Sequence, residues 1–166
     1  SEHVDMAETL ESTTKSYGVP MLLSDAFYSL LTDDRQEECR KIDQLHHVDG
    51  ATLELYTWDM DIENIWKDSI DKLKKMDELP DSVIEYDPGL WEHANMKLIR
   101  EKFGSDFLLK YKKALNFYTE GYWKHARNMF RELIRDYQDG PSNYFVELMK
   151  ENDFLPARDF TGTGQL

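Results

Sequence analysis

Two groups of side chains in this sequence have the chemical types that bind metal ions. His46 and His47 are adjacent, but neighbouring residues of a strand point to opposite faces, so both rings cannot chelate one ion. Asp59, Asp61 and Glu63 resemble the start of a calcium-binding loop, yet the central glycine and terminal glutamate of such a loop are missing. We therefore predict partly exposed strand histidines and a solvated acidic helix entry, because carboxylates are favoured near a helix N-terminus.

The composition is that of a folded, acidic protein. The chain has 166 residues, 40% of them hydrophobic and 13% aromatic, which supplies enough apolar surface for a core. Its net charge of -13 disfavours binding to nucleic acid or to an anionic membrane surface. No stretch approaches the roughly 20 apolar residues of a membrane span, and no secretion signal is visible. Together with a single cysteine, Cys39, these features predict a cytoplasmic protein, with membrane anchoring of a longer parent left open.

Residues 1–60 are predicted to form an α/β segment that begins with a helix. Apolar residues recur at helical spacing over 2–17, and Gly18 supplies the stop. A short apolar run over 20–23 has the character of a strand. A capping serine then opens a helix over 24–31, which the polar residues after it should close.

The end of this segment is predicted to be a β-hairpin. Two alternating stretches, 39–48 and 52–58, flank Asp49 and Gly50. This dipeptide is preferred in tight hairpin turns, which need a positive φ. On the first strand Ile42 and Leu45 are followed by Val48, and on the second strand Leu53, Leu55 and Thr57 share one parity.

The remainder of the chain is predicted to be helical and to divide into a linker region and an all-α extension. The linker region spans residues 61–105 and contains an amphipathic helix over 62–73 followed by a proline-containing stretch over 78–89. The extension spans residues 106–166 and ends in an irregular tail. Further helices are expected around 90–103, 106–119, 122–137 and 141–150.

One pair of these helices has the pattern of a tetratricopeptide (TPR) hairpin. Ala114, Phe117, Ala126 and Phe130 occupy its small and aromatic positions, with Gly121 at the turn. The unit occurs once, and such repeats normally need about three copies to be stable alone. The hairpin should therefore pack on the first segment; whether it also offers a peptide-binding groove stays open.

The α/β segment resembles the class III adenylate and guanylate cyclases. The run from Val4 to Ser24 contains Val-Asp-Met-Ala-Glu-Thr-Leu-Glu and then Thr-Lys-Ser-Tyr-Gly-Val-Pro. It is similar to the family's Val-Asn-x-Ala-x-Arg-Leu-Glu, Thr-Lys-x-Tyr-Gly-Val-Pro and a strand ending in Ser. The stretches Cys39 to Asp43 and Leu53 to Thr57 resemble two strands of the family, Arg-x-Ile/Leu-Asp and the final Pro-x-Glu-Leu-Tyr. The resemblance implies the C-terminal part of a ferredoxin-like cyclase domain.

The helical extension resembles one that follows this domain in many microbial and protist cyclases. The stretches that carry this second resemblance are Gly121 to Ala126, Asp139 to Ser142 and Asn152 to Phe154. Both resemblances occur in the family's order and together cover nearly the whole chain. Residues 59–105 are the least recognisable part.

The resemblance implies an active site between two paired cyclase domains. One domain supplies two aspartates that bind Mg²⁺ or Mn²⁺, and the other supplies an asparagine, an arginine and a phosphate-binding lysine. Hard oxygen ligands suit a metal that bridges phosphates, and fixed cations stabilise the charge that develops in phosphoryl transfer. The strands that carry the metal aspartates are expected upstream of the first residue here.

The catalytic positions that remain are degenerate. Asp5 stands at the asparagine position and Thr9 at the arginine position, so a cation is lost and a negative charge is added. Where the family commonly has Val-Lys-Gly-Lys, this chain has Val-Asp-Gly-Ala, ending at Ala51. We expect no catalytic, cofactor-binding or metal-binding residue in this chain, although an active parent would use Mg²⁺ or Mn²⁺ with ATP or GTP.

These features predict a catalytically incomplete part of a cyclase in cyclic-nucleotide signalling, with a role in domain pairing or regulation. Two versions stay open: the parent is the metal-supplying half of an asymmetric pair, or it is a pseudocyclase. A protein-interaction module that uses the TPR-like extension is the competing class. The expected partners are a second cyclase domain, or the rest of the same polypeptide, and a protein bound to the extension.

Overall fold

A computed structural model describes residues 2–46, 52–61 and 94–165, and it confirms a mixed α/β chain. The chain divides into two compact units, residues 1–59 with 105–166 and residues 60–104. The first segment and the helical extension thus belong to the same unit. None of the described helices is long and apolar enough to cross a membrane.

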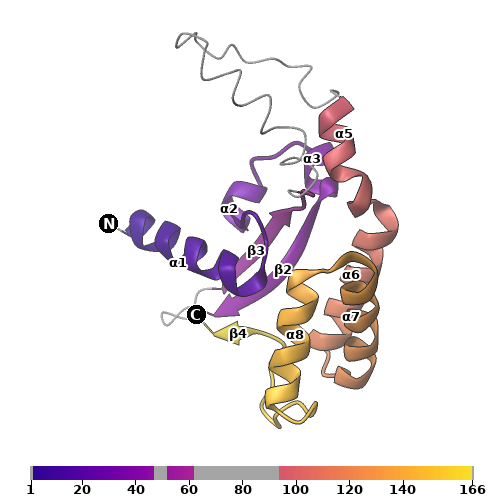
Figure 1. Cartoon of the computed structure of the whole chain (residues 1–166). Coiled ribbons are helices and arrows are strands. Elements are labelled where there is room, and N and C mark those ends of the chain that lie inside the picture. The colour runs from indigo at the N-terminus through magenta and orange to yellow at the C-terminus, as the bar shows by residue number, and fades with distance from the viewer. Residues whose placement is uncertain (1, 47–51, 62–93, 166) are drawn as a thin grey trace. The chain divides into compact units, whose positions relative to one another are not determined.

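A small sheet organises the larger unit (Figure 1). Its strand order is β1 (Leu23–Ser24), β3 (Thr52–Trp58), β2 (Cys39–His46) and β4 (Gly164–Gln165). The first three strands are antiparallel, whereas β4 pairs in parallel with β2. The predicted hairpin strands are confirmed, while its turn, with Val48, lies outside the described residues. Leu53, Leu55 and Thr57, which share one parity as predicted, are all buried.

A β-bulge in β2 changes the alternation of that strand. Lys41 lies opposite Tyr56 and Asp43 lies opposite Leu55, so Ile42 is the extra residue between two paired positions. Ile42 and Leu45 are both buried although they are three residues apart, which regular alternation would not allow. The bulge also brings the acidic side chain of Asp43 onto the buried face.

The N-terminal helix α1 (Glu2–Tyr17) is confirmed over the predicted residues. The next predicted helix is shorter than expected: α2 covers only Asp25–Tyr28, with the Ser24 side chain accepting a hydrogen bond from the Phe27 N–H. The polar residues expected to close it instead open a further helix, α3 (Asp33–Glu38). Two aspartates in the first turn of α3 face the positive end of its dipole, which favours a helix start there.

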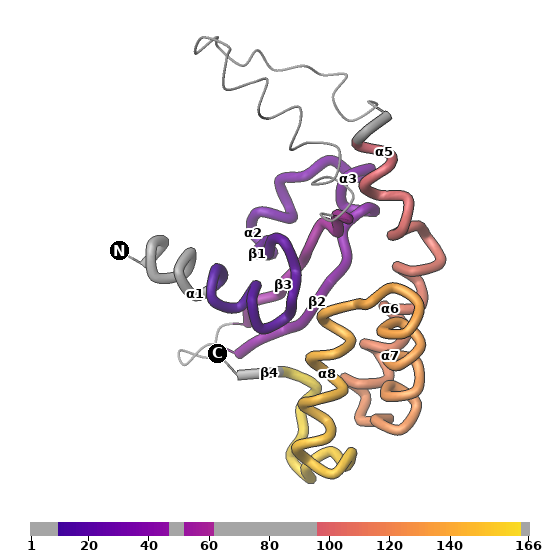
Figure 2. The backbone as a smooth tube through the Cα atoms, viewed as in Figure 1, coloured from indigo at the N-terminus to yellow at the C-terminus, as the bar shows by residue number. Residues whose placement is uncertain are grey.

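Three longer helices form the extension as predicted: α6 (Ser105–Thr119), α7 (Trp123–Tyr137) and α8 (Gly140–Glu151). Helix α6 packs against β2, α8 packs against α1, and α7 contacts both α6 and α8. Figure 2 follows the backbone through α6, α7 and α8. The tail after α8 then returns to the sheet, where β4 pairs with the end of β2. The core shared by α6, α7 and α8 is aromatic. Its central residues, Phe107, Tyr111, Phe130 and Phe145, are fully buried.

The smaller unit is described only at its ends. Helix α5 (Ala94–Arg100) and the 3-10 helix η2 (Glu101–Phe103) lie within the helix predicted around 90–103. The Asp61 N–H donates to the Ile99 carbonyl at 2.9 Å and so links the two ends of this unit. The helix predicted over 62–73 and the stretch predicted over 78–89 lie outside the described residues.

Candidate functional site

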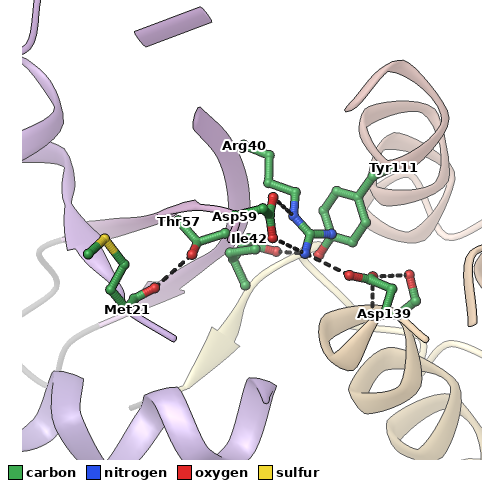
Figure 3. Close-up of polar contacts among 8 residues, drawn as sticks. Met21, Arg40, Ile42, Thr57, Asp59, Tyr111 and Asp139 are labelled. Carbon is green, nitrogen blue, oxygen red and sulfur yellow. Dashed lines mark hydrogen bonds and ion pairs between the residues drawn. The ribbon is translucent and has the colours of Figure 1, made fainter. Parts of the chain in front are cut away.

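A buried ion-pair cluster centred on Arg40 joins the hairpin to the extension (Figure 3). Arg40 lies on the inward face of β2, and its Nε is 2.8 Å from Asp59 Oδ2 at the end of β3. Its Nη2 donates to Asp59 Oδ1 at 2.8 Å and to Asp139 Oδ1 at 2.6 Å. All three side chains are at most 4% exposed. One cation therefore neutralises two buried carboxylates from distant parts of the chain.

Two aromatic rings of α6 cover the Arg40 guanidinium. Its Cζ lies 4.2 Å from the ring centroid of Tyr111 and 4.7 Å from that of Phe107. Burial by itself lowers the pKa of Arg40, but the charges of Asp59 and Asp139 outweigh it and raise that pKa above its usual range. The Tyr111 hydroxyl donates to the carbonyl of the bulge residue Ile42 at 3.3 Å. The guanidinium is thus permanently charged and held in one place.

Asp139 uses its second carboxylate oxygen to begin helix α8. Its Oδ2 accepts hydrogen bonds from the Ser142 N–H at 2.9 Å and from the Ser142 hydroxyl at 2.5 Å. This is an N-cap that satisfies one of the free N–H groups of the first turn, with Pro141 in the first helical turn. The same carboxylate therefore fixes α8 and binds Arg40.

Gly140 brings the turn before α8 into contact with the end of α1. A Cβ atom on Gly140 would lie 2.4 Å from the Tyr17 carbonyl oxygen and 2.7 Å from that of Gly18. Gly18 itself has φ +64 and terminates α1, as its position predicted. Only a residue without a side chain allows the two backbones to approach so closely.

A second buried carboxylate lies beside this contact. The Tyr17 hydroxyl donates to Asp43 Oδ2 at 2.6 Å, and the Gln44 N–H donates to Asp43 Oδ1 at 2.7 Å. Burial raises the pKa of Asp43 to about 6, although these two hydrogen bonds and the charge of Lys41 oppose the increase. The Tyr17 ring packs 4.4 Å from that of Tyr144 on α8. Asp43 and Tyr17 therefore join β2, α1 and α8.

No protein-family model, curated protein or solved structure matches this chain.

The cluster is built to hold segments together. Arg40, Asp43, Asp59 and Asp139 are each at most 5% exposed, so none of them presents an accessible reactive group. Among the residues that the structure describes, no group of three or more histidine, cysteine, aspartate or glutamate side chains could hold a metal ion. What the arrangement can do chemically is fix the position of the extension relative to the sheet.

The positions predicted to be degenerate catalytic positions are described only in part. Asp5 and Thr9 lie one turn apart in α1, but their side chains are outside the described part of the structure. Ala51 lies outside the described residues altogether. The expectation that these positions have no catalytic role therefore stays a prediction.

The solvated location predicted for Asp59 is wrong. Its side chain is 4% exposed and paired with Arg40, because β3 continues its inward alternation to the residue that follows Trp58. One signal in the sequence pointed to this pairing. Arg40 has the same parity as Ile42 on a strand with a buried face, and a buried guanidinium requires an acidic partner.

The pH dependence of stability tests the buried state of Asp43. Its pKa of about 6 in the folded chain lies above the unfolded value of about 3.9, so protonation favours the folded state. The stabilisation from Asp43 is complete below about pH 4 and is lost as the pH rises through 6. Asp43→Asn keeps the shape of the side chain without the charge. We expect the free energy of unfolding of the wild type, relative to Asp43→Asn, to fall by about 2 to 3 kcal/mol between pH 4 and pH 7.

Urea titrations of both proteins over this pH range measure the difference. Other carboxylates titrate in both proteins and cancel in the comparison. The groups around Asp43 that could complicate it are Tyr17, Tyr118 and Tyr144, whose pKa values are all raised, first of all by burial, so they stay neutral. A difference that is constant with pH would contradict the raised pKa of the buried Asp43 carboxyl.

Proposed function

We propose that this chain is the C-terminal, noncatalytic part of a class III nucleotide cyclase-like polypeptide, with a TPR-like extension locked onto a ferredoxin-like cyclase sheet. One observation carries the proposal. The stretches that resemble the cyclase domain supply Tyr17, Gly18 and Arg40, and the stretch that resembles the extension supplies Asp139 and Gly140. Motifs recognised separately in the sequence contact each other in one buried cluster, as expected if both derive from one ancestral architecture.

The role proposed for the chain is domain pairing or regulation in cyclic-nucleotide signalling. Its partner is a second cyclase domain or the remainder of its own polypeptide. The metal ion, Mg²⁺ or Mn²⁺, and the nucleotide, ATP or GTP, are bound by other parts of an active parent. The half-site that contains Asp5, Thr9 and Ala51 makes no contribution to the chemistry, because it offers no cation to a polyphosphate.

A protein-interaction module is the second candidate. Among its described side chains, the extension exposes three large apolar ones, Leu109 at 68%, Tyr122 at 56% and Leu155 at 70%. Exposed aromatic and aliphatic residues of this kind are common in protein-binding surfaces. In this version the parent is a pseudocyclase, and the sheet only positions the extension.

A cyclase assay of the full natural polypeptide, alone and with a paired cyclase domain, tests the proposal. We expect Asp5→Ala and Thr9→Ala to leave the rate of cyclic-nucleotide formation within about twofold of the wild type. Removal of a group that stabilised the transition state would instead lower the rate about 100-fold to 1000-fold.

Three outcomes are distinguishable. Product that survives both substitutions supports a working enzyme whose chemistry lies elsewhere. A large loss of the rate of cyclic-nucleotide formation from either substitution contradicts the proposal that Asp5 and Thr9 do not contribute to the chemistry. No product from ATP or GTP with either metal ion, with or without the paired domain, favours the pseudocyclase.

A further inference from the structure

A stripe of basic residues runs along helix α7. Lys124, Arg127, Arg131 and Arg135 are spaced by three, four and four residues, which places them on one side of an α-helix. They extend over about 16 Å at the rise of an α-helix. Residues 105–166 contain nine Lys and Arg and nine Asp and Glu, so the acidic excess of the chain lies before residue 105. The stripe is therefore a local positive feature on an acidic protein.

Three cations of the stripe have no acidic partner among the described residues. Lys124 and Arg131 are exposed and Arg127 is half-buried, and none of the three forms an ion pair within the described part of the chain. Arg135 is different, because its Nε lies 2.7 Å from Asp136 Oδ1. The positive charge at the N-terminal and central parts of α7 is thus available to an external anion.

The turn after α8 holds Arg127 in place. The Arg127 Cζ lies 4.7 Å from the centroid of the Phe154 ring. Phe154 has φ 58 and Asp153 has φ 53, an unfavourable conformation for residues other than glycine. The strained turn is stabilised by the Phe154 N–H, which donates to the Met149 carbonyl at 2.7 Å. Stacking restricts the guanidinium before any ligand arrives, which lowers the entropy lost on binding.

We propose that three residues of the stripe, Lys124, Arg127 and Arg131, bind an acidic peptide segment of a partner protein. The rest of the same unit argues against a longer polyanion, because residues 1–59 carry 13 Asp and Glu and only four Lys and Arg. An RNA strand or an anionic bilayer would extend into this negative field, whereas a short acidic segment matches the length of the stripe. The inference depends on the surface of α7 alone and does not require the cyclase relationship.

The test uses a fluorescein-labelled peptide of alternating glutamate and alanine of about 12 residues, which can span the stripe as a helix. Fluorescence anisotropy with the chain should show saturable binding that weakens as salt is added. The double substitution Lys124→Glu and Arg131→Glu should weaken binding at least about tenfold, because it places like charges against the ligand. Lys112→Glu with Lys113→Glu changes the net charge equally at exposed positions of α6, and should leave the affinity within about twofold.

Several results would overturn the proposal: absence of saturable binding to the wild type, equal weakening in both double variants, or binding of single-stranded RNA or phosphatidylserine vesicles at least as tight as that of the peptide. Circular dichroism melting of each variant shows whether it is folded. If the double variant does not fold, the single substitution Arg131→Gln replaces it and should still weaken peptide binding. An unchanged affinity of the Arg131→Gln protein would overturn the proposal. The cyclase assay is independent of all these outcomes, so the two proposals can fail separately.

Discussion

Replacing Arg40 with methionine is expected to lower the free energy of unfolding by about 3 to 5 kcal/mol. Methionine has a similar length but no charge, so Asp59 and Asp139 would be left buried without their common cation. The loss is large against the total stability of about 5 to 15 kcal/mol that is typical of folded proteins. Urea unfolding followed by circular dichroism measures it.

A surface ion pair provides the matched control. Lys150 on α8 lies 2.9 Å from Glu147, with both side chains more than half exposed. Lys150→Ala should cost less than about 1 kcal/mol, because solvent screens such a pair. In the Arg40→Met background, Asp59→Asn with Asp139→Asn should restore part of the stability, since the orphaned charges are removed. A cost for Arg40→Met as small as that for Lys150→Ala would contradict the role of the cluster.

Gly140→Ala is expected to lower the free energy of unfolding by about 2 to 3 kcal/mol although it adds a single methyl group. The new Cβ would lie 2.4 Å from one backbone oxygen and 2.7 Å from another, and neither can rotate away as a side chain would. Relief requires α8 to move away from α1, which would disturb the hydrogen bonds of Asp139 at the adjacent position. Urea unfolding again measures the effect.

Gly104→Ala is the corresponding control. Gly104 has φ -71, and a Cβ at that position would have no neighbour within 4 Å. The substitution should be neutral or stabilise the protein by about 0.4 to 1 kcal/mol, since alanine restricts the unfolded chain. Equal stability of Gly140→Ala and Gly104→Ala proteins would show that the close approach of the two backbones is not required.

The site residues fall into two groups. Asp5, Thr9 and Ala51 were identified through the resemblance to cyclases, and the structure does not describe the side chains that matter. Arg40 and Asp139 belonged to the resembling motifs but had no assigned partner, because their contact joins positions 99 residues apart. The resemblance to cyclases identified the positions of single residues, whereas the contact between Arg40 and Asp139 is known only from the packed structure.

Local patterns in the amino-acid sequence were sufficient for the extents of α1, α6, α7 and α8 and for the strands of the hairpin. Helical periodicity, the stop at Gly18 and the alternation that ends in Thr57 act over a few residues, so they can be recognised without any knowledge of the fold. The bulge at Ile42, the burial of Asp59 and the parallel pairing of β4 were decided by the tertiary structure. Each of these features depends on which helices and strands pack against the sheet. A charged side chain becomes buried, and an edge strand gains a partner, only where segments distant in the sequence come together and exclude water.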